Sequence, residues 1–280
     1  MLSLTQKKRY KRDGFLILPD FLTVDICDLL IDEGAKLIIN ANIDGIKTIF
    51  SSKNRRHQNQ LYFLESGDKI GFFFEEGAIN AKGELQKEKL FAINKIGHAL
   101  HDLNPIFNSV SRSHKVATLI KELDILNPLL IQSMYICKQP YIGSEVLPHQ
   151  DSTYLFVKNN PITGLWFALQ DATLKNGCLW VIPGGHRGPL KSRFIRDANN
   201  ETHIEVYDGS PWSLEKMIPL PVSRGSVIAL HGLLPHMSYE NTSSHGRHAY
   251  TLHVMSANDE FATDNWLKRP KEMPFRGFLE

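Results

Sequence analysis

The chain has 280 residues, of which 42% are hydrophobic and 22% charged, and its formal net charge is +2. A chain of this length buries a core large enough for one domain, and its near balance of charge argues against the broad basic surface of a nucleic-acid-binding protein. The three cysteines lie far apart and form no C-x-x-C pair, which argues against a disulfide framework and favours a reducing compartment.

The N-terminal residues carry a dense basic cluster, formed by Lys7, Lys8, Arg9, Lys11 and Arg12. We interpret this cluster as the solvated face of a first helix, while a nuclear address or a contact with an anion is the alternative. No apolar segment precedes a cleavage site, the C-terminal tripeptide is not peroxisomal, and no run of about 20 apolar residues is present to span a membrane. We therefore expect a soluble protein of the cytoplasm or the nucleus.

Helical periodicity dominates the first half of the sequence. Apolar residues recur at helical spacing in residues 20–39, where Thr23 is the candidate N-cap, and again in residues 92–103 and 114–123. We therefore expect helices over these three segments.

The second half changes to short apolar runs, rich in β-branched and aromatic residues and separated by glycine, proline and asparagine. The expected strands lie at 130–137, 164–170, 178–182, 226–231 and 248–255. Two polar stretches, 53–60 and 199–215, are expected to be irregular. They are either mobile loops near a site or ordinary surface loops.

Helices early and strands late argue against a doubly wound α/β sheet. We predict a mainly β fold with helical additions, a double-stranded β-helix (the cupin-like jelly roll) braced by N-terminal helices. We expect a single domain over residues 1–280. Its helical support would lie mainly in 1–128 and its jelly-roll core mainly in 129–257.

A candidate metal site begins at His149 and Asp151, which follow Pro148 and are two residues apart. On an extended backbone, residues at this spacing project from the same face, so an imidazole and a carboxylate can bind one cation. We place the pair at the start of a strand, a position that suits a proline because it has no backbone donor. Since H-x-D alone is common by chance, a third ligand from another strand is required.

His236 is the best third candidate, because it follows the expected strand 226–231 and a turn. In a jelly roll, we expect this later strand to return beside the one that carries the first pair. Two imidazoles and one carboxylate form the facial triad of non-haem Fe(II) oxygenases, which leaves coordination positions open. His231, on the same strand and turn, is the rival ligand, while His253 is expected in the core or behind the ligands.

Arg247 follows His236 along the chain and opens the expected strand 248–255. Its guanidinium can pair through two parallel hydrogen bonds with a carboxylate, such as the distal carboxylate of 2-oxoglutarate. A surface ion pair is the alternative for an arginine taken alone. Beside the triad, we interpret Arg247 as a residue that binds the cosubstrate.

With these residues identified, the sequence resembles the phytanoyl-CoA dioxygenase family over most of its length. The matching segments are 13–18, 66–70, 72–75, 93–100, 132–136, 148–151, 176–180 and 265–267. The resemblance implies a double-stranded β-helix that binds Fe(II) through the catalytic residues His149, Asp151 and His236. It also implies a 2-oxoglutarate pocket that these ligands form together with Lys95, Met134, Trp166 and Arg247.

The reaction that the resemblance implies uses Fe(II), 2-oxoglutarate and O2, and it couples oxidative decarboxylation of 2-oxoglutarate to hydroxylation of a substrate. Asp151 favours hydroxylation over halogenation, because related iron halogenases lack the carboxylate. The founding hydroxylase of the family carries a targeting presequence that is not found here, so phytanoyl-CoA is not the expected substrate.

The sequence does not identify the substrate, which we expect to be a small molecule or an acyl compound bound by a monomer. Lys191, Arg193 and Arg196 are available basic groups for an acyl-CoA, and the phenylalanine-rich segment 69–76 is either a substrate wall or a core strand. The alternative to an enzyme is a cupin-like module that binds metal or a 2-oxo acid without turnover. The H-E-x-x-H and G-x-S-x-G patterns of zinc and serine hydrolases do not occur.

Overall fold

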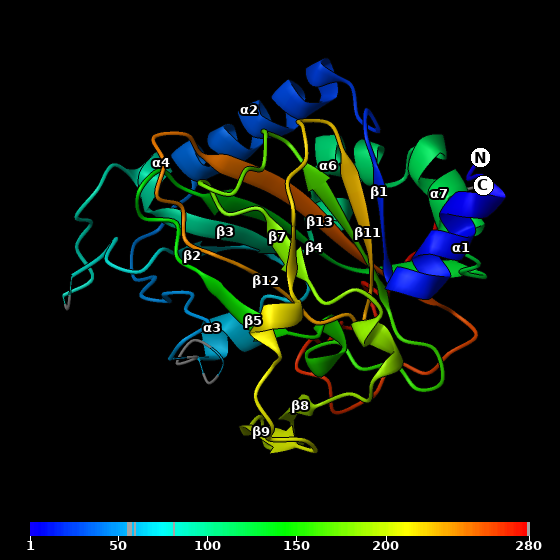
Figure 1. Cartoon of the computed structure of the whole chain (residues 1–280). Helices are drawn as coiled ribbons and strands as arrows, with labels where there is room; N and C mark the ends of the chain where they lie inside the picture. Colours follow the sequence, from blue (N-terminus) through cyan, green and yellow to red (C-terminus); the bar gives the residue numbers. More distant parts are fainter. Residues whose placement is uncertain (55–57, 59, 81, 279–280) are drawn as a thin grey trace.

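The computed structural model describes residues 1–54, 58, 60–80 and 82–278, and Figure 1 labels most of its elements. The strands are β1 Phe15–Leu18, β2 Ile70–Phe74, β3 Ile93–His98, β4 Pro128–Lys138, β5 Val146–His149, β6 Thr163–Ala168, β7 Leu179–Val181, β8 Ser192–Arg196, β9 Thr202–Val206, β10 Ile218–Leu220, β11 Val227–His231, β12 His236–Ser238 and β13 Arg247–Ser256. The helices are α1 Leu4–Asp13, α2 Val24–Asn40, α3 Leu61–Leu64, α4 Lys89–Ala92, α5 Leu100–Leu103, α6 Pro105–Ser111 and α7 His114–Glu122, with 3₁₀ turns η2 Asp151–Thr153, η3 Gly185–Arg187 and η4 Leu214–Lys216.

Two antiparallel sheets form the body of the molecule. The larger is seven-stranded, in the order β1-β11-β6-β13-β4-β3-β2, and the smaller is four-stranded, in the order β10-β7-β12-β5. Helices α2 and α6 lie along one face of the larger sheet (Figure 1), where Leu30 and Phe107 join Tyr135 of β4 and Tyr250 of β13 in the main apolar core. The predicted jelly roll with helical bracing is confirmed.

Alternation along the central strands gives one face of the larger sheet to the helices and the other face to a cavity between the sheets. On β13, Tyr250 and Leu252 belong to the core beneath the helices, whereas Thr251 and His253 line the cavity. Side chains that carry chemistry therefore reach the interior from a sheet whose other face is fixed by apolar packing.

Most predicted elements are present. Helix α2 begins after Thr23, whose hydroxyl accepts a hydrogen bond from the Ile26 amide at 3.3 Å. Helix α7 matches the segment 114–123, and the five expected strands appear as β4, β6, β7, β11 and β13. The basic cluster lies on α1, where Lys7 and Lys11 form ion pairs with Glu122 and Asp124.

The helix predicted for residues 92–103 is wrong. Residues Ile93–His98 form β3 between β2 and β4, and only Leu100–Leu103 are helical in the later part of the segment. All 6 residues of β3 are buried. Pairing with two neighbouring strands thus outweighs the helical spacing of Ile93, Ile96 and Leu100, which is ambiguous in a short apolar run.

The irregular stretch predicted at 199–215 is wrong for Thr202–Val206, which form β9 and pair with β8. Ile204 lies opposite the buried Phe194 in this hairpin, so a small apolar contact is enough to order a mostly polar strand. Of the other predicted loop, residues 55–57 and 59 lie outside the described residues.

The first 128 residues contribute β1, β2 and β3 to the larger sheet in addition to helices. The N-terminal half is therefore part of the jelly-roll sheet as well as its brace, and the single domain over 1–280 stays a prediction. Within the described part of the chain, no helix combines the length and the apolar character that crossing a bilayer requires.

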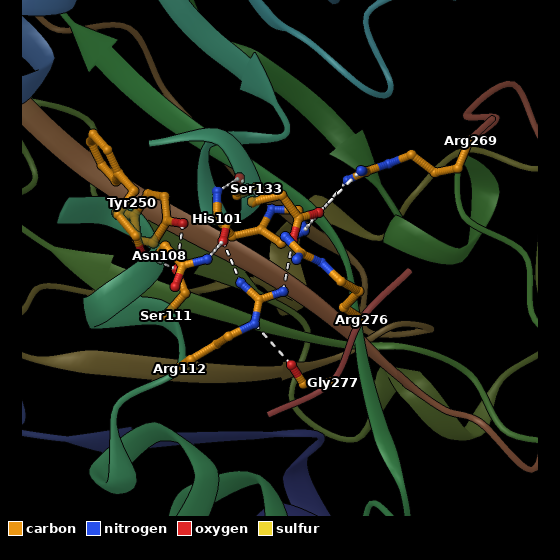
Figure 2. A network of polar contacts seen from close by, with 11 residues as sticks. His101, Asn108, Ser111, Arg112, Ser133, Tyr250, Arg269, Arg276 and Gly277 are labelled. Carbon is orange, nitrogen blue, oxygen red and sulfur yellow. Dashed lines mark hydrogen bonds and ion pairs between the residues drawn. The ribbon is translucent and has the colours of Figure 1, made fainter. Parts of the chain in front are cut away.

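A buried charge cluster fixes the C-terminal segment to the helical layer (Figure 2). The fully buried Asp102 carboxylate pairs with Arg112 at 2.7 Å, Arg269 at 3.1 Å and Arg276 at 2.9 Å. The nearby Trp266 lines the cavity between the sheets. The cluster therefore anchors the segment that supplies one wall of the cavity.

Candidate metal centre

Three candidate ligands meet where β5 and β12 pair. His149, the last residue of β5, lies directly opposite His236, the first residue of β12, and their ring centroids are 4.3 Å apart. Asp151 opens η2, and its Oδ1 atom is 3.6 Å from Nε2 of each histidine. One ligand atom from each residue lies within 4.8 Å of the others, an arrangement that a single metal ion requires.

Both histidines direct Nε2 toward this point because their Nδ1 atoms are occupied. Nδ1 of His149 donates to the carbonyl of Leu147 at 2.9 Å, and Nδ1 of His236 donates to the carbonyl of Leu234 at 3.0 Å. Since a carbonyl only accepts, the proton lies on Nδ1 and the lone pair of Nε2 is available to a metal. Burial lowers the pKa of His236 to about 4, which favours the neutral, metal-binding form.

Asp151 remains a carboxylate in this largely buried position. Burial alone raises its pKa, but electrostatic interaction with the His236 and His253 rings and the contact with His149 lower the pKa well below its usual value. Asp151 and His236 are therefore in the protonation states that bind a divalent cation.

The local geometry of the His149–Asp151 pair corrects the prediction. The pair lies at the end of β5 and not at the start of a strand, because Asp151 already belongs to a 3₁₀ turn. Gln150 remains extended, and its buried side chain donates to the carbonyls of Pro189 at 3.1 Å and Leu233 at 2.9 Å. These bonds fix the bend that brings the carboxylate beside the imidazoles.

The strand that returns beside β5 also differs from the prediction. Strand β11, which covers 227–231, lies in the larger sheet, and it is the short strand β12 that pairs with β5. The rival ligand His231 packs against His186 with ring centroids 4.9 Å apart. It belongs to no metal-ligand group among the residues that the structure describes.

The ligands lie in the wall of a cavity of about 180 Å³ between the two sheets. Strand register gives this cavity two ends, because Arg247 lies opposite Lys138 and His253 opposite Gln132, and all four residues line it. Nε2 of His253 is 3.3 Å from Asp151, which places the metal end at His253 and the cationic end at Arg247.

Arg247 provides the test of whether a carboxylate ligand fits. The side chain is 2% exposed, and its Nε and Nη1 atoms have no hydrogen-bond partner among the described residues. Its guanidinium carbon is 5.2 Å from the centre of the Trp166 ring. Burial lowers the pKa of Arg247 to about 10, so the group stays charged at neutral pH and needs an anionic partner.

Lys95 enters the same cavity from β3. Its ammonium lies 3.2 Å above the centre of the Phe50 ring. Burial lowers the pKa of Lys95 to about 7, while Glu75 opposes this shift. Met134 and Trp166 also line the cavity, so the structure brings all four cosubstrate residues implied by the resemblance into one cavity with the three ligands.

Two buried charged residues of this cavity were missed by sequence reasoning. Glu75 is 0% exposed and accepts hydrogen bonds from Asn94 at 2.8 Å and Ser144 at 2.5 Å. Lys138 donates to the carbonyl of Ser144 at 2.7 Å. In the phenylalanine-rich segment, Phe73 and Phe74 are core residues and only Glu75 lines the cavity. The signal was a charge at the end of an apolar run.

The chain is similar to known proteins over nearly its whole length. A sequence profile of the family described as phytanoyl-CoA dioxygenase (PhyH) matches residues 10–249. Phytanoyl-CoA dioxygenase domain-containing protein 1 from Rattus norvegicus is 41% identical over 283 residues, which cover 98% of this chain and 97% of that protein. A phytanoyl-CoA dioxygenase from Arabidopsis thaliana is 42% identical over 267 residues, covering 94% and 92%.

Solved structures show the same fold at lower sequence identity. EctD from S. alaskensis with 2-oxoglutarate and 5-hydroxyectoine has a TM-score of 0.66 at 18% identity and covers 100% of this chain and 86% of that one. The epimerase SnoN in complex with Fe3+, alpha ketoglutarate and nogalamycin RO has a TM-score of 0.64 at 14% identity, covering 92% and 84%. From the profile match and the near full-length relatives, the chain belongs to the phytanoyl-CoA dioxygenase family.

Proposed function

We propose that the protein is an Fe(II)- and 2-oxoglutarate-dependent dioxygenase that couples oxidative decarboxylation of 2-oxoglutarate to hydroxylation of an unidentified substrate. The observation that carries this proposal is the convergence of His149, Asp151 and His236 in a cavity whose other end holds the guanidinium of Arg247, two of whose nitrogens have no partner among the described residues. Membership of the family supports the reaction class.

Each residue has a role in this proposal. His149, Asp151 and His236 hold the iron, which when bound activates O2 and polarises the 2-oxo acid. Arg247 binds the distal carboxylate of 2-oxoglutarate, and the fork of its guanidinium orients that carboxylate. Lys95 supplies a second positive charge for the cosubstrate. Trp166 and Met134 form apolar walls that exclude water from the cosubstrate.

The metal end of the cavity indicates what kind of group reacts. Its walls include Phe63, Tyr154 and Trp266, and Gln132 supplies a neutral polar group. The described part of this end carries no lysine or arginine. We propose that the part of the substrate that reaches the metal is uncharged and apolar.

The basic residues considered for an acyl-CoA have partners within the protein. Lys191 pairs with Asp208 at 2.9 Å and Arg193 with Asp264 at 2.5 Å. Arg196 is buried and donates to the carbonyl of Leu64 at 2.7 Å. Because the charges of Lys191 and Arg193 are neutralised in place and the Arg196 guanidinium is bound by backbone carbonyls, these residues do not support a site for the phosphates of coenzyme A.

The test is succinate release from 2-oxoglutarate by the purified chain with Fe(II) under O2. We expect wild-type protein to release succinate and Asp151→Ala to lose this activity, because a facial triad without its carboxylate holds iron poorly. His231→Ala, which changes the rival histidine, is the matched control and should retain activity.

Full succinate release by Asp151→Ala would remove the metal assignment. Binding of Fe(II) and 2-oxoglutarate by wild-type protein with no succinate under O2, even with a panel of uncharged apolar compounds, would indicate the cupin-like binding module. The monomeric state and the cytoplasmic or nuclear location remain predictions.

A further inference from the structure

A third histidine contacts the metal-binding carboxylate from the opposite sheet. His253 lies on β13 of the larger sheet, and its Nε2 atom is 3.3 Å from Oδ2 of Asp151. The other oxygen, Oδ1, faces Nε2 of His149 and His236 at 3.6 Å. The two oxygens of Asp151 therefore have separate partners, one on the metal side and one on the side of the larger sheet.

We propose that His253 is a positioning residue that holds Oδ2 of Asp151 away from the metal, so that the carboxylate binds through Oδ1 alone. This inference rests on the proposed function. A facial triad leaves three coordination positions, of which a chelating 2-oxo acid takes two and O2 one. A carboxylate that bound through both oxygens would occupy one of these positions.

The contact between His253 and Asp151 depends on space that the neighbouring strand leaves. In the register of the larger sheet, His253 lies opposite Gly164 of β6. A Cβ atom at Gly164 would be 3.2 Å from Oδ2 of Asp151 and 3.6 Å from Cδ2 of His253. A Cβ atom there would press on the Asp151 carboxylate and come into ordinary contact with the His253 ring, which favours a glycine at this position of a buried strand.

The hydrogen-bonding state of His253 separates it from the histidines that serve the core. His101 and His248 are also buried, and their Nδ1 atoms bond to Ser133 at 2.8 Å and Tyr135 at 2.6 Å. In His253, by contrast, Nδ1 has no partner among the described residues. Because buried polar groups are normally satisfied, a purely structural histidine would not be expected to leave one nitrogen unpaired.

The chemistry of the carboxylate determines which group donates in the contact between His253 and Asp151. A carboxylate oxygen only accepts, so Nε2 of His253 donates to Oδ2 of Asp151. His253 is 5% exposed, so water has little access to replace this donor. A donor held in place by the sheet, and not by solvent, is suited to select one binding mode of the carboxylate.

Two variants test the inference on the full-length chain. His253→Phe keeps the volume and removes the donor, while His253→Gln retains an N–H near the position of Nε2. With Co(II) as an anaerobic metal probe, we expect His253→Phe to lose about 10- to 100-fold in metal affinity and His253→Gln to recover most of it. The visible charge-transfer absorption of the anaerobic complex with Fe(II) and 2-oxoglutarate should weaken in His253→Phe and return in His253→Gln.

His248→Phe is the matched control, because it removes a buried histidine from the same strand but from the face that points toward Tyr135. We expect it to lower thermal stability and leave the Co(II) affinity unchanged. Equal loss of Co(II) affinity in His248→Phe and His253→Phe would assign both residues to the fold alone and overturn the inference.

Wild-type Co(II) affinity and a wild-type absorption band in a folded His253→Phe protein would also overturn it. If Asp151→Ala nevertheless lost metal binding, the proposed function would stand while the role of His253 fell. Failure of wild-type protein to bind Co(II) would instead end the proposed function.

Discussion

The guanidinium of Arg247 is buried with two nitrogens that have no partner among the described residues. A buried polar group without a hydrogen bond costs roughly 1–3 kcal/mol. Proteins retain such a cost at functional sites, where a ligand removes it. Arg247 should therefore lower the free energy of unfolding when 2-oxoglutarate is absent and raise it when 2-oxoglutarate is bound.

Replacement of Arg247 tests both effects, on stability without ligand and on cosubstrate binding. In Arg247→Met, we expect the free energy of unfolding without ligand to be equal to or above wild type, because an unpaired charge is removed from the interior. The Kd for 2-oxoglutarate should rise by about 30-fold or more, since loss of one partner from a buried charge pair costs about 2 kcal/mol or more. Denaturant titration and anaerobic binding measure the two effects.

Arg224→Met is the control for Arg247→Met, because Arg224 is paired with Asp28 near the surface. It should leave 2-oxoglutarate binding unchanged. Wild-type affinity in Arg247→Met would show that the cosubstrate carboxylate binds elsewhere.

Lys95 gives cosubstrate binding a pH dependence. Burial, assisted by the charge of Arg247 and opposed by Glu75, lowers its pKa to about 7. Since only the protonated form attracts a carboxylate, the affinity for 2-oxoglutarate should fall as pH rises through about 7. The effect on folding stability has a different pH range. Lys95 takes up a proton below pH 10.5 in the unfolded chain but only below about pH 7 in the folded chain, so its contribution lowers the free energy of unfolding as pH falls from 10.5 to about 7.

Lys95→Arg separates charge from pH in this prediction. An arginine stays protonated across the range, so the pH dependence of 2-oxoglutarate affinity should flatten. The same slope in wild-type and Lys95→Arg proteins would assign the pH dependence to another group. Isothermal titration at several pH values makes the measurement.

At the scale of elements, the sequence was sufficient where local signals agree with the fold. Thr23 caps α2 as its position indicated, and the ligand types and spacing of His149, Asp151 and His236 pointed to three side chains that the structure brings together. β3 could not be predicted, because its strand pairing depends on β2 and β4, which are distant in sequence. For the same reason the contact of His253 with the carboxylate is visible only after the two sheets are placed together.

The C-terminal segment is attached to the helical layer through one buried carboxylate. Asp102 forms ion pairs with three arginines, of which Arg269 and Arg276 lie in that segment (Figure 2). Burial alone raises the pKa of Asp102, but His101 and the arginines lower it well below 3.8. Its stabilising effect is therefore present above 3.8 and is lost as pH falls through the lowered pKa.

Asp102→Asn should loosen this segment. Removing one partner of a buried ion-pair cluster costs about 3–5 kcal/mol, because the remaining arginines become uncompensated. We expect a lower free energy of unfolding and faster hydrogen exchange near Trp266, with weaker substrate binding as a consequence of the displaced wall. Lys158→Ala removes an exposed pair with Glu260 and should have little effect. Wild-type exchange near Trp266 in Asp102→Asn would show that other contacts hold the segment.

On the scale of the whole molecule, the side chains that would bind the metal and the cosubstrate come from both sheets. His149 and His236 come from the smaller sheet, whereas Lys95, Arg247 and His253 come from the larger one. A metal ion with 2-oxoglutarate would therefore connect groups on both sheets across the cavity. Ligand binding should stabilise the sandwich as a unit and not a single loop.

This division predicts how the two ligands stabilise the protein. A ligand at 100 times its Kd adds about 2.7 kcal/mol to the free energy of unfolding. Co(II) alone should raise the melting temperature, and 2-oxoglutarate should add a larger increment when metal is present, because chelation lets one molecule contact both sheets. Asp151→Ala should lose the metal increment and most of the cosubstrate increment, whereas Arg247→Met should lose only the cosubstrate increment. Anaerobic thermal unfolding measures the stabilisation by 2-oxoglutarate, once with Co(II) and once with a chelator in place of the metal. Equal stabilisation in the two conditions would contradict a cosubstrate site shared between the two sheets.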